Sequence, residues 1–260
     1  MTLDKAGIKR SFAAASKTYD NVAELQRTVA RELLQAIDTT HLTGTLLDLG
    51  CGTGFLTGEL LARSHYETMI ALDIALPMLQ ATQSKLADKP NMGYVCADAE
   101  HLPLGDQRID SVLSNLALQW CRNLDAVFTD IKRVLKPEGQ LVFSTFGPQT
   151  LHELKSAWAT VDHYSHVNEF YSETQLKHFL VQAGFKNSQV KSTVYISRYQ
   201  SVWTLMQELK HLGAQHVVAG RNKKITTKIA MQKMIAAYEK HKVSDQIPAT
   251  FEVISVIAKV

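Results

Sequence analysis

Short apolar runs alternate with amphipathic segments along the first 150 residues of the chain. The predicted strands are runs that are mostly apolar and often end in glycine or an acidic residue: 44–50, 69–73, 92–97, 109–114 and 139–146. The predicted helices between them carry apolar positions at helical spacing: 55–63, 76–87 and 123–135. Strands that alternate with helices imply crossover connections, so the pattern predicts a doubly wound, mostly parallel α/β sheet.

Helical segments flank this alternation at both ends. Before the first strand, helices are predicted over 5–17 and 21–38. In the second of these, Leu25, Val29, Leu33 and Ile37 recur at helical spacing. After the fifth strand the simple alternation ends. The later predicted elements are helices at 148–160, 172–183, 199–212 and 226–241 and strands at 185–197 and 251–258.

We interpret residues 1–260 as a single domain with a seven-stranded sheet. Residues 1–40 form an N-terminal helical cover, 41–198 and 247–260 the core sheet, and 199–246 a helical insertion before the last strand. Insertions on the carboxyl side of a parallel sheet cover the crevice where ligands bind. The insertion is therefore interpreted as a lid or substrate-binding platform.

Composition supports an ordinary globular protein, with 45% hydrophobic and 20% charged residues. No apolar run approaches the roughly 18 residues of a membrane-spanning helix, and the first residues lack the apolar core of a secretory signal. A soluble, cytoplasmic protein without a membrane partner is expected. The three cysteines form no CxxC pair and the ten histidines show no metal-binding spacing, so no metal site is predicted.

Basic residues gather in the insertion. Between Arg198 and Lys242, nine lysines and arginines face only Glu208 and Glu239 as acidic residues. Such a segment indicates an acidic partner, which could be nucleic acid, an anionic lipid or an acidic protein. A lysine-rich, solvated helical surface is the alternative interpretation.

Residues 48–54 (Asp-Leu-Gly-Cys-Gly-Thr-Gly) join the first strand to the following helix. Glycines here let the backbone approach a ligand, and the helix start offers free N–H groups. A dinucleotide fingerprint is excluded, because Phe55 or Thr57 stands where the third glycine of GxGxxG belongs. A phosphate-binding P-loop is excluded as well, because no Gly-Lys-Ser/Thr sequence follows.

The turn resembles the first motif of the class I S-adenosylmethionine-dependent methyltransferases, in which Asp48, Gly50, Gly52 and Gly54 match acid-x-Gly-x-Gly-x-Gly. The resemblance implies a Rossmann-like fold and S-adenosylmethionine as cofactor. It also implies that an acid at the end of the second strand binds the ribose hydroxyls and that Asp98 binds the adenine amino group. The implied cofactor-binding residues are Tyr19, Gln26, Asp48, Gly50, Cys51, Gly52, Gly54, Asp73, Ile74, Met78, Asp98, Ala99, Asn115 and Leu116.

Several of these residues have a structural alternative. Asp73 and Asp98 could serve only as helix caps, and Met78 could be a filler of the core. Cys51 is interpreted as a small residue within the turn rather than as a nucleophile, because no histidine lies nearby in the sequence. Tyr19 could pack at a helix start instead of closing over the cofactor.

Further segments are similar to the malonyl-acyl-carrier-protein O-methyltransferase family of biotin synthesis. They are residues 8–20 together with 23–27, 114–120, 143–154, 213–216 and 220–223. The implied reaction moves a methyl group to the free carboxylate of a malonyl thioester. That carboxylate is ionised at neutral pH, with a pKa near ~4, so it needs no general base. No catalytic acid or base is therefore predicted.

The resemblance also implies an acyl carrier protein that delivers the malonyl group on a phosphopantetheine arm. Candidate docking residues are Lys210, Lys223, Lys224, Lys228 and Lys233. The malonyl carboxylate is assigned to Arg221 first and Arg198 second, because arginine binds carboxylates through two hydrogen bonds. Either arginine could instead form a surface salt bridge. Gln119 and Trp120 complete the predicted substrate-binding residues, and core packing is the alternative for Trp120.

Three rival functions remain at this point. Methylation of a quinone ring carbon benefits from a general base, and residues 114–120 contain no histidine or acid. An RNA methyltransferase would fit the basic segment, but no RNA-binding module or interleaved aromatic residues are present, so no nucleic-acid partner is expected. A non-catalytic regulator that binds the cofactor cannot be separated from an enzyme by sequence.

Overall fold

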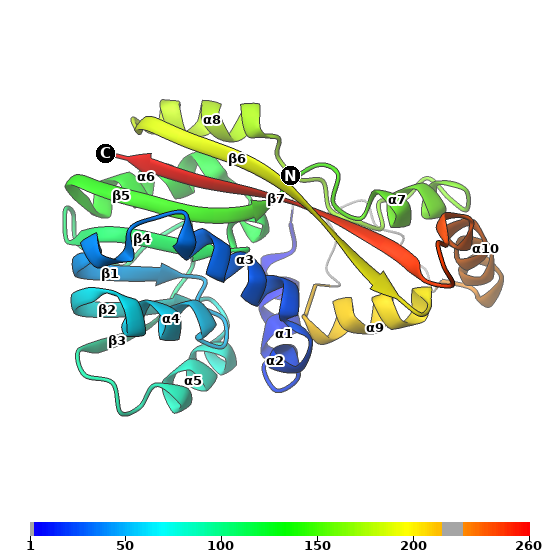
Figure 1. Cartoon of the computed structure of the whole chain (residues 1–260), viewed down its shortest axis with the longest axis horizontal. Coiled ribbons are helices and arrows are strands. Elements are labelled where there is room, and N and C mark those ends of the chain that lie inside the picture. Colours follow the sequence, from blue (N-terminus) through cyan, green and yellow to red (C-terminus); the bar gives the residue numbers. More distant parts are fainter. Residues whose placement is uncertain (1–2, 215–225) are drawn as a thin grey trace.

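A seven-stranded sheet forms the centre of the computed structural model, which describes residues 3–214 and 226–260 (Figure 1). The strand order is β3-β2-β1-β4-β5-β7-β6, and β7 runs antiparallel to both of its neighbours. The predicted doubly wound, mostly parallel sheet is confirmed. The strands are β1 (Thr43–Leu49), β2 (His65–Asp73), β3 (Met92–Cys96), β4 (Ile109–Asn115), β5 (Leu135–Phe146), β6 (Lys186–Tyr199) and β7 (Ile247–Lys259).

Helices cover both faces of the sheet (Figure 1). The α-helices are α1 (Lys5–Ala15), α2 (Tyr19–Val22), α3 (Glu24–Gln35), α4 (Phe55–Arg63), α5 (Leu76–Lys85), α6 (Leu124–Val134), α7 (His152–Ala159), α8 (Glu173–Gln182), α9 (Val202–His211) and α10 (Lys228–Tyr238). Three short 3-10 helices are η1 (Thr39–His41), η2 (Leu118–Trp120) and η3 (Glu239–His241). Among the described helices, none is long and apolar enough to cross a membrane.

The central strand β1 is apolar on both faces because both faces are buried. Leu46 packs in a cluster with residues of α3 and α4. Leu47 and Leu49 point to the opposite face and pack in a cluster with residues of α6 and α8. A strand buried on both sides appears in the sequence as a continuous apolar run instead of an alternating one.

The predicted helix boundaries are wrong at two places. The predicted helix 21–38 is two helices, because buried Ala23 has a non-helical backbone (φ −85°, ψ 38°) between α2 and α3. Helix α7 begins at His152 rather than at 148, because Leu151 has a positive φ of 55°. Helical periodicity reports which residues share a face, and it does not detect a single residue that leaves helical geometry.

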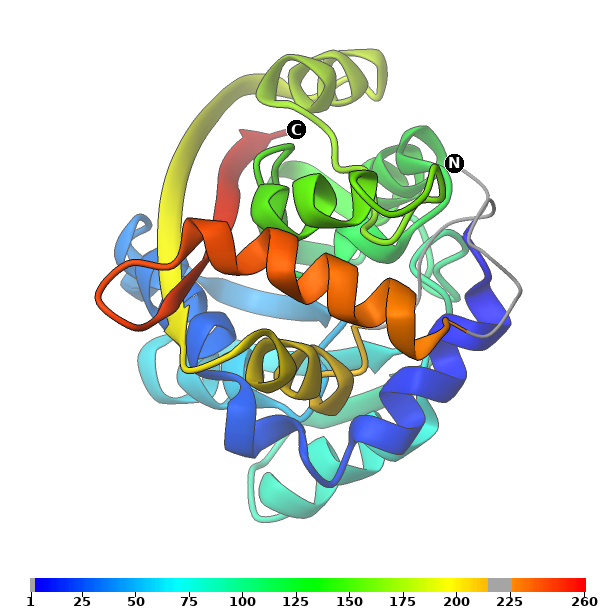
Figure 2. The same ribbon diagram turned by 90° about the vertical axis from the view of Figure 1, so that its right-hand side faces the viewer.

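The last two strands extend beyond the sheet. Strand β6 pairs along the whole of β7, whereas β5 pairs only with residues 253–259, so residues 247–252 of β7 pair with β6 alone. Helices α7, α9 and α10 pack on this extension around a second buried cluster that includes Trp158, Leu205 and Tyr238. Figure 2 shows α10 crossing in front of the ribbon between α7 and α9. The segment between β6 and β7 therefore leaves and re-enters at the carboxyl edge of the parallel strands.

The second cluster predicts a measurable contribution from Tyr238. Its side chain is fully buried, and its hydroxyl donates a hydrogen bond of 2.9 Å to the carbonyl of Pro248. Tyr238→Phe keeps the ring and removes this bond, so we expect a loss of about 1 kcal/mol in the free energy of unfolding. Urea denaturation followed by circular dichroism measures it.

The matched control is Ile229→Ala on the same helix. Ile229 is 66% exposed. This change should alter the free energy of unfolding by less than about 0.5 kcal/mol. Equal losses for the two variants would contradict the importance of the buried hydroxyl.

Candidate functional site

The glycine turn between β1 and α4 brings bare backbone to the carboxyl edge of the sheet. Gly50 and Gly52 have positive φ values of 78° and 55°. A Cβ atom on Gly50 would lie 2.4 Å from the Cβ of Ala117, so glycine allows the loop after β4 to approach. A Cβ on Gly52 would meet nothing within 4 Å. Gly52 therefore leaves its side of the turn open to a ligand.

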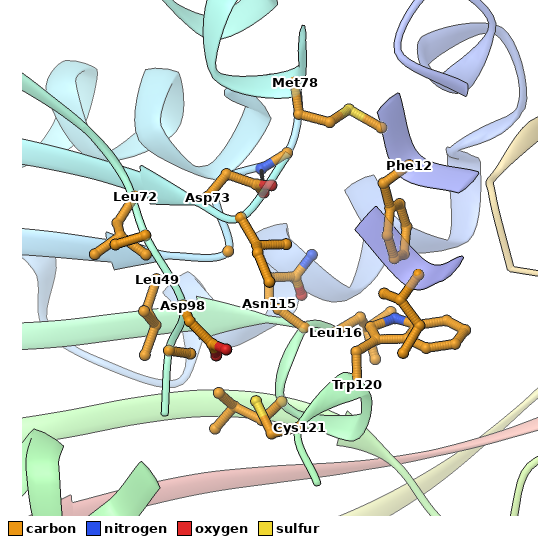
Figure 3. Close-up of a pocket in the computed structure, with 18 of the residues that line it drawn as sticks. Phe12, Leu49, Leu72, Asp73, Met78, Asp98, Asn115, Leu116, Trp120 and Cys121 are labelled. Atoms are coloured by element: carbon orange, nitrogen blue, oxygen red, sulfur yellow. Dashed lines mark hydrogen bonds between the residues drawn. The ribbon is translucent and has the colours of Figure 1, made fainter. Parts of the chain in front are cut away.

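A cavity of about 100 Å³ lies beside this turn, at the ends of β1, β2 and β4 (Figure 3). Figure 3 shows Asp73 and Asp98 on one side of it, Phe12 and Trp120 opposite, and Met78 above with its side chain directed toward Phe12. Its lining includes these predicted residues: Tyr19, Gly50, Gly52, Asp73, Ile74, Met78, Asp98, Ala99, Asn115, Leu116 and Trp120.

A second cavity of about 40 Å³ adjoins the first and shares Tyr19, Gly50, Gly52 and Asn115 with it. It adds Gln26, Asp48 and Cys51 to the predicted residues that meet here. Gly54 lines neither cavity. It begins α4 in a left-handed conformation, and a Cβ there would lie 2.8 Å from the methyl group of Thr82.

Asp73 ends β2 with its carboxylate fixed by the backbone. Its Oδ2 accepts from the N–H of Gly52 at 2.9 Å and its Oδ1 from the N–H of Ala75 at 2.8 Å. Burial raises the pKa of this carboxyl group. A carboxylate oxygen accepts more than one hydrogen bond, so Asp73 still offers acceptor positions toward the first cavity.

Asp98 follows β3 and is held by a residue that sequence reasoning missed. Lys5 of α1 forms ion pairs with Asp98 and with Glu100, the latter at 2.7 Å. The Lys5 ammonium and the Glu100 backbone N–H hold the pKa of Asp98 below its usual range, although burial alone would raise it. Lys5 and Asp98 are 93 positions apart, so no local pattern in the sequence signals the pair.

Asp48 carries a polar atom without a partner in the described structure. Its Oδ2 accepts from the hydroxyl of Thr57 at 2.5 Å, and its Oδ1 is buried with no hydrogen bond. Burial raises the pKa of this carboxyl group to about 7. The Oε1 atom of Gln26 on the same cavity is also buried without a donor. Two such acceptors fit a ligand that carries an ammonium group.

The N-terminal helices are fastened over these cavities. Thr53 of the glycine turn donates to Asp20 of α2 at 2.6 Å, and Lys85 of α5 forms an ion pair with Asp20. Phe12 of α1 packs edge-on against Trp120 with ring centroids 5.3 Å apart. Asp20 and Phe12 were missed as individual site residues, although both lie in the 8–20 segment that resembles the family.

Of the described residues that were predicted to bind the substrate, one lines a cavity and two do not. Trp120 lines the first cavity. Gln119 lines none of the cavities; it donates to the carbonyl of Leu116 at 2.6 Å and so braces the loop after β4. Arg198 is exposed on β6 and also lines none of them, because it faces away from the side of the strand that packs on α9. Arg221, Lys223 and Lys224 lie outside the described residues.

Cys51 is a buried free cysteine in the glycine turn. Burial raises the pKa of the Cys51 thiol, which lies 3.8 Å from the hydroxyl of Thr82. A neutral, buried thiol packs as a small apolar side chain. In residues 3–214 and 226–260, no three His, Cys, Asp or Glu side chains are grouped as a metal ion would require.

Comparison with known proteins identifies the class. Residues 47–143 match the family model of a methyltransferase domain. The crystal structure of a putative methyltransferase from Bacillus halodurans C-125 has a TM-score of 0.63 at 16% identity, covering 89% of this chain and 98% of that one. Together with the strand order and the glycine turn, these matches define a class I, S-adenosylmethionine-dependent methyltransferase.

Closer relatives identify the family within this class. A malonyl-[acyl-carrier protein] O-methyltransferase from Methylovorus sp. (strain MP688) is 40% identical, covering 97% of this chain and 88% of its own length. A biotin biosynthesis bifunctional protein from Cellvibrio japonicus (strain Ueda107) is 39% identical over 96% of this chain and 49% of its own length. The chain belongs to the malonyl-[acyl-carrier protein] O-methyltransferase family.

The unpartnered oxygen of Asp48 predicts that its substitution weakens cofactor binding. Asp48→Asn removes the charge that would pair with the ammonium of the methionine moiety. A hydrogen bond to a charged group contributes about 1.5–3 kcal/mol, so we expect the Kd for S-adenosylhomocysteine to rise roughly ten- to hundredfold. Isothermal titration calorimetry measures it, with the exposed Asp88→Asn as the matched control.

The same variant should change how stability depends on pH. The pKa of Asp48 is about 7 in the folded protein against an ordinary 3.8, so the folded state binds more protons than the unfolded state between these values. Asp48 therefore lowers the stability as pH rises through this window. Asp48→Asn should flatten that fall, and an unchanged pH profile would contradict the buried charge.

Proposed function

We propose that this chain transfers a methyl group from S-adenosylmethionine to the free carboxylate of malonyl-acyl carrier protein. The product is the malonyl methyl ester that starts pimelate assembly in biotin biosynthesis. We also propose that the protein is located in the cytoplasm. The match to relatives of this name over nearly the whole chain carries the proposal. The two cavities at the glycine turn support it, because they combine an apolar wall with acidic groups.

The cofactor supplies a methyl group bound to a positively charged sulfur. Asp48 and Gln26 would hold the ammonium end of the methionine moiety, because both have buried, unpartnered oxygens. Asp73 would accept hydrogen bonds from the ribose hydroxyls, and its fixed orientation would reduce the entropy lost on binding. Ile74, Met78 and Asp98, which line the first cavity, would hold the adenine.

No side chain is required to remove a proton from the acceptor, because the malonyl carboxylate is already ionised at neutral pH. The residues act by positioning it and by excluding water. Phe12, Leu116, Leu118 and Trp120 give the first cavity an apolar wall on the acceptor side. Alignment of the reacting atoms is worth on the order of ~7–11 kcal/mol at its limit, and a dry site favours a step that neutralises charge.

The acceptor carboxylate also needs a positive partner. Arg221 stays the first candidate from the sequence, since Arg198 points away from the cavities. Gln119 acts indirectly in this proposal, because its bond to Leu116 holds the loop that carries Trp120. Residues 199–246 form the lid in this proposal, since both ends of the segment lie at the carboxyl edge of the sheet.

The proposed reaction is tested by mixing the protein with labelled S-adenosylmethionine and either malonyl- or succinyl-acyl carrier protein. We expect label in a base-labile methyl ester of the malonyl substrate and at least tenfold less in the succinyl substrate. Mass spectrometry of the carrier protein identifies the ester. Label in a quinone precursor or in tRNA, with none in malonyl-acyl carrier protein, would overturn the proposal.

Acyl carrier proteins are acidic, and the basic helices of the insertion offer a complementary surface. Lys210 on α9 and Lys228 and Lys233 on α10 are exposed. Charged residues at the edge of an interface act mainly on the association rate, and their effect weakens as the salt concentration rises. We propose that these lysines, with Lys223 and Lys224, form the docking surface.

Reversal of charge at Lys210, Lys228 and Lys233 should raise KM for malonyl-acyl carrier protein several-fold at low salt. The reason is weaker steering of the acidic carrier, and the effect should shrink at high salt. Malonyl-coenzyme A kinetics serve as a readout without the carrier. The matched control is Lys177→Glu on α8, where the side chain is 50% exposed. An unchanged KM in the triple variant would exclude this surface.

A further inference from the structure

A third cavity, of about 80 Å³, lies between the sheet and the α7–α9 side of the molecule. Trp120 lines both this cavity and the first one, and Gln26 lines both this cavity and the second. Leu209, Leu212 and Ala214 at the end of α9 form another part of its wall. The third cavity therefore adjoins the first two cavities at Trp120 and Gln26 and reaches the end of α9 in the insertion.

The wall of the third cavity is mostly apolar. Its remaining described lining consists of Phe146, Thr150, Leu151, Leu154, His166, Val167, Asn168, Phe170 and Phe251. An ionised carboxylate that enters such a cavity loses its hydration and requires a compensating charge or hydrogen bonds. Of the described side chains that line it, His166 alone can carry a positive charge.

His166 is fixed in a single orientation. Its ring stacks on Trp158 with centroids 3.7 Å apart and planes 6° apart. Its Nε2 lies 2.9 Å from Oδ1 of Asp162, and Asp162 also accepts from the backbone N–H of Tyr164 at 3.0 Å. The side chain of His166 is 16% exposed. With Nε2 committed to a carboxylate, Nδ1 is the ring nitrogen that remains for a ligand.

We propose that the third cavity receives the acyl end of the thioester and that His166 binds its free carboxylate. The inference rests on the proposed function and assigns to His166 the role for which the sequence alone offered Arg221, which lies outside the described residues. Because Nε2–H donates to Asp162, Nδ1 donates to one carboxylate oxygen only when the ring carries both protons, and the other oxygen stays available to attack the methyl group. Asp162 holds the ring through Nε2.

The arrangement also favours release of the product. A methyl ester carries no charge, so it gains nothing from a positively charged imidazole. His166 therefore binds the anionic substrate more tightly than the neutral ester. This difference selects for acyl groups that end in a carboxylate.

Two substitutions separate the charge of His166 from its packing. His166→Gln keeps a hydrogen-bond donor and removes the charge, and His166→Phe keeps the stacked ring and removes both. We expect kcat/KM for malonyl-acyl carrier protein to fall ten- to hundredfold in the Phe variant, mainly through KM, and less in the Gln variant. The Kd for S-adenosylhomocysteine should stay within twofold of the wild-type value. His163→Ala, an exposed histidine on the same loop, is the matched control and should behave as wild type.

The outcomes distinguish this inference from the proposed function. A wild-type protein that does not methylate malonyl-acyl carrier protein contradicts the proposed function. If the wild type is active and both His166 variants keep its kcat/KM, the inference alone is contradicted. Loss of activity in Arg221→Ala in the same assays would assign the carboxylate to Arg221 instead. Loss of S-adenosylhomocysteine binding in both His166 variants would assign the residue to folding and would also overturn the inference.

Discussion

The buried carboxylate of Asp48 is the constraint on which the cofactor site depends. A carboxylate placed at the end of a central strand, among apolar side chains, is costly unless it has partners. Thr57 provides one partner from α4, and the second oxygen has none in the described structure. The protein keeps this group in place because β1 and α4 are locked by the sheet and its two clusters. Under the proposed function, the ammonium group of the cofactor offsets this cost.

The remaining parts of the site follow from the same edge of the sheet. Parallel strands end together, so Asp73, Asp98 and Asn115 reach one cavity from three different strands (Figure 3). The N-terminal helices then cover that edge, held by Lys5 at one end and Asp20 at the other. Extended β6 and β7 carry α9 and α10 to the same side, which places the end of α9 on the wall of the third cavity.

The strands and the glycine turn were predictable because their signals are local, and most of the cavity-lining residues were named through the resemblance to the methyltransferase motif. An apolar run that ends in Asp48-Leu49-Gly50 defines a buried strand and a tight turn without reference to the rest of the chain. Helix starts were less predictable. Ala23 and Leu151 leave helical geometry and are both buried, and their neighbours in sequence give no sign of either property. Arg198 was selected by its chemistry, and its strand turns it to the outer face.

The sequence by itself determined the class of fold, the cofactor turn and, through its resemblance to one family, the expected reaction. The period of hydrophobic residues and the positions of glycines involve only residues close together in the chain, so both can be recognised from the sequence alone. Only the tertiary structure decided that Lys5 meets Asp98, that Asp20 fastens α2 to the turn, and that His166 stands on an apolar cavity next to Trp120. Such contacts join residues tens of positions apart, and their free energy depends on the packing of the whole chain rather than on any segment of it.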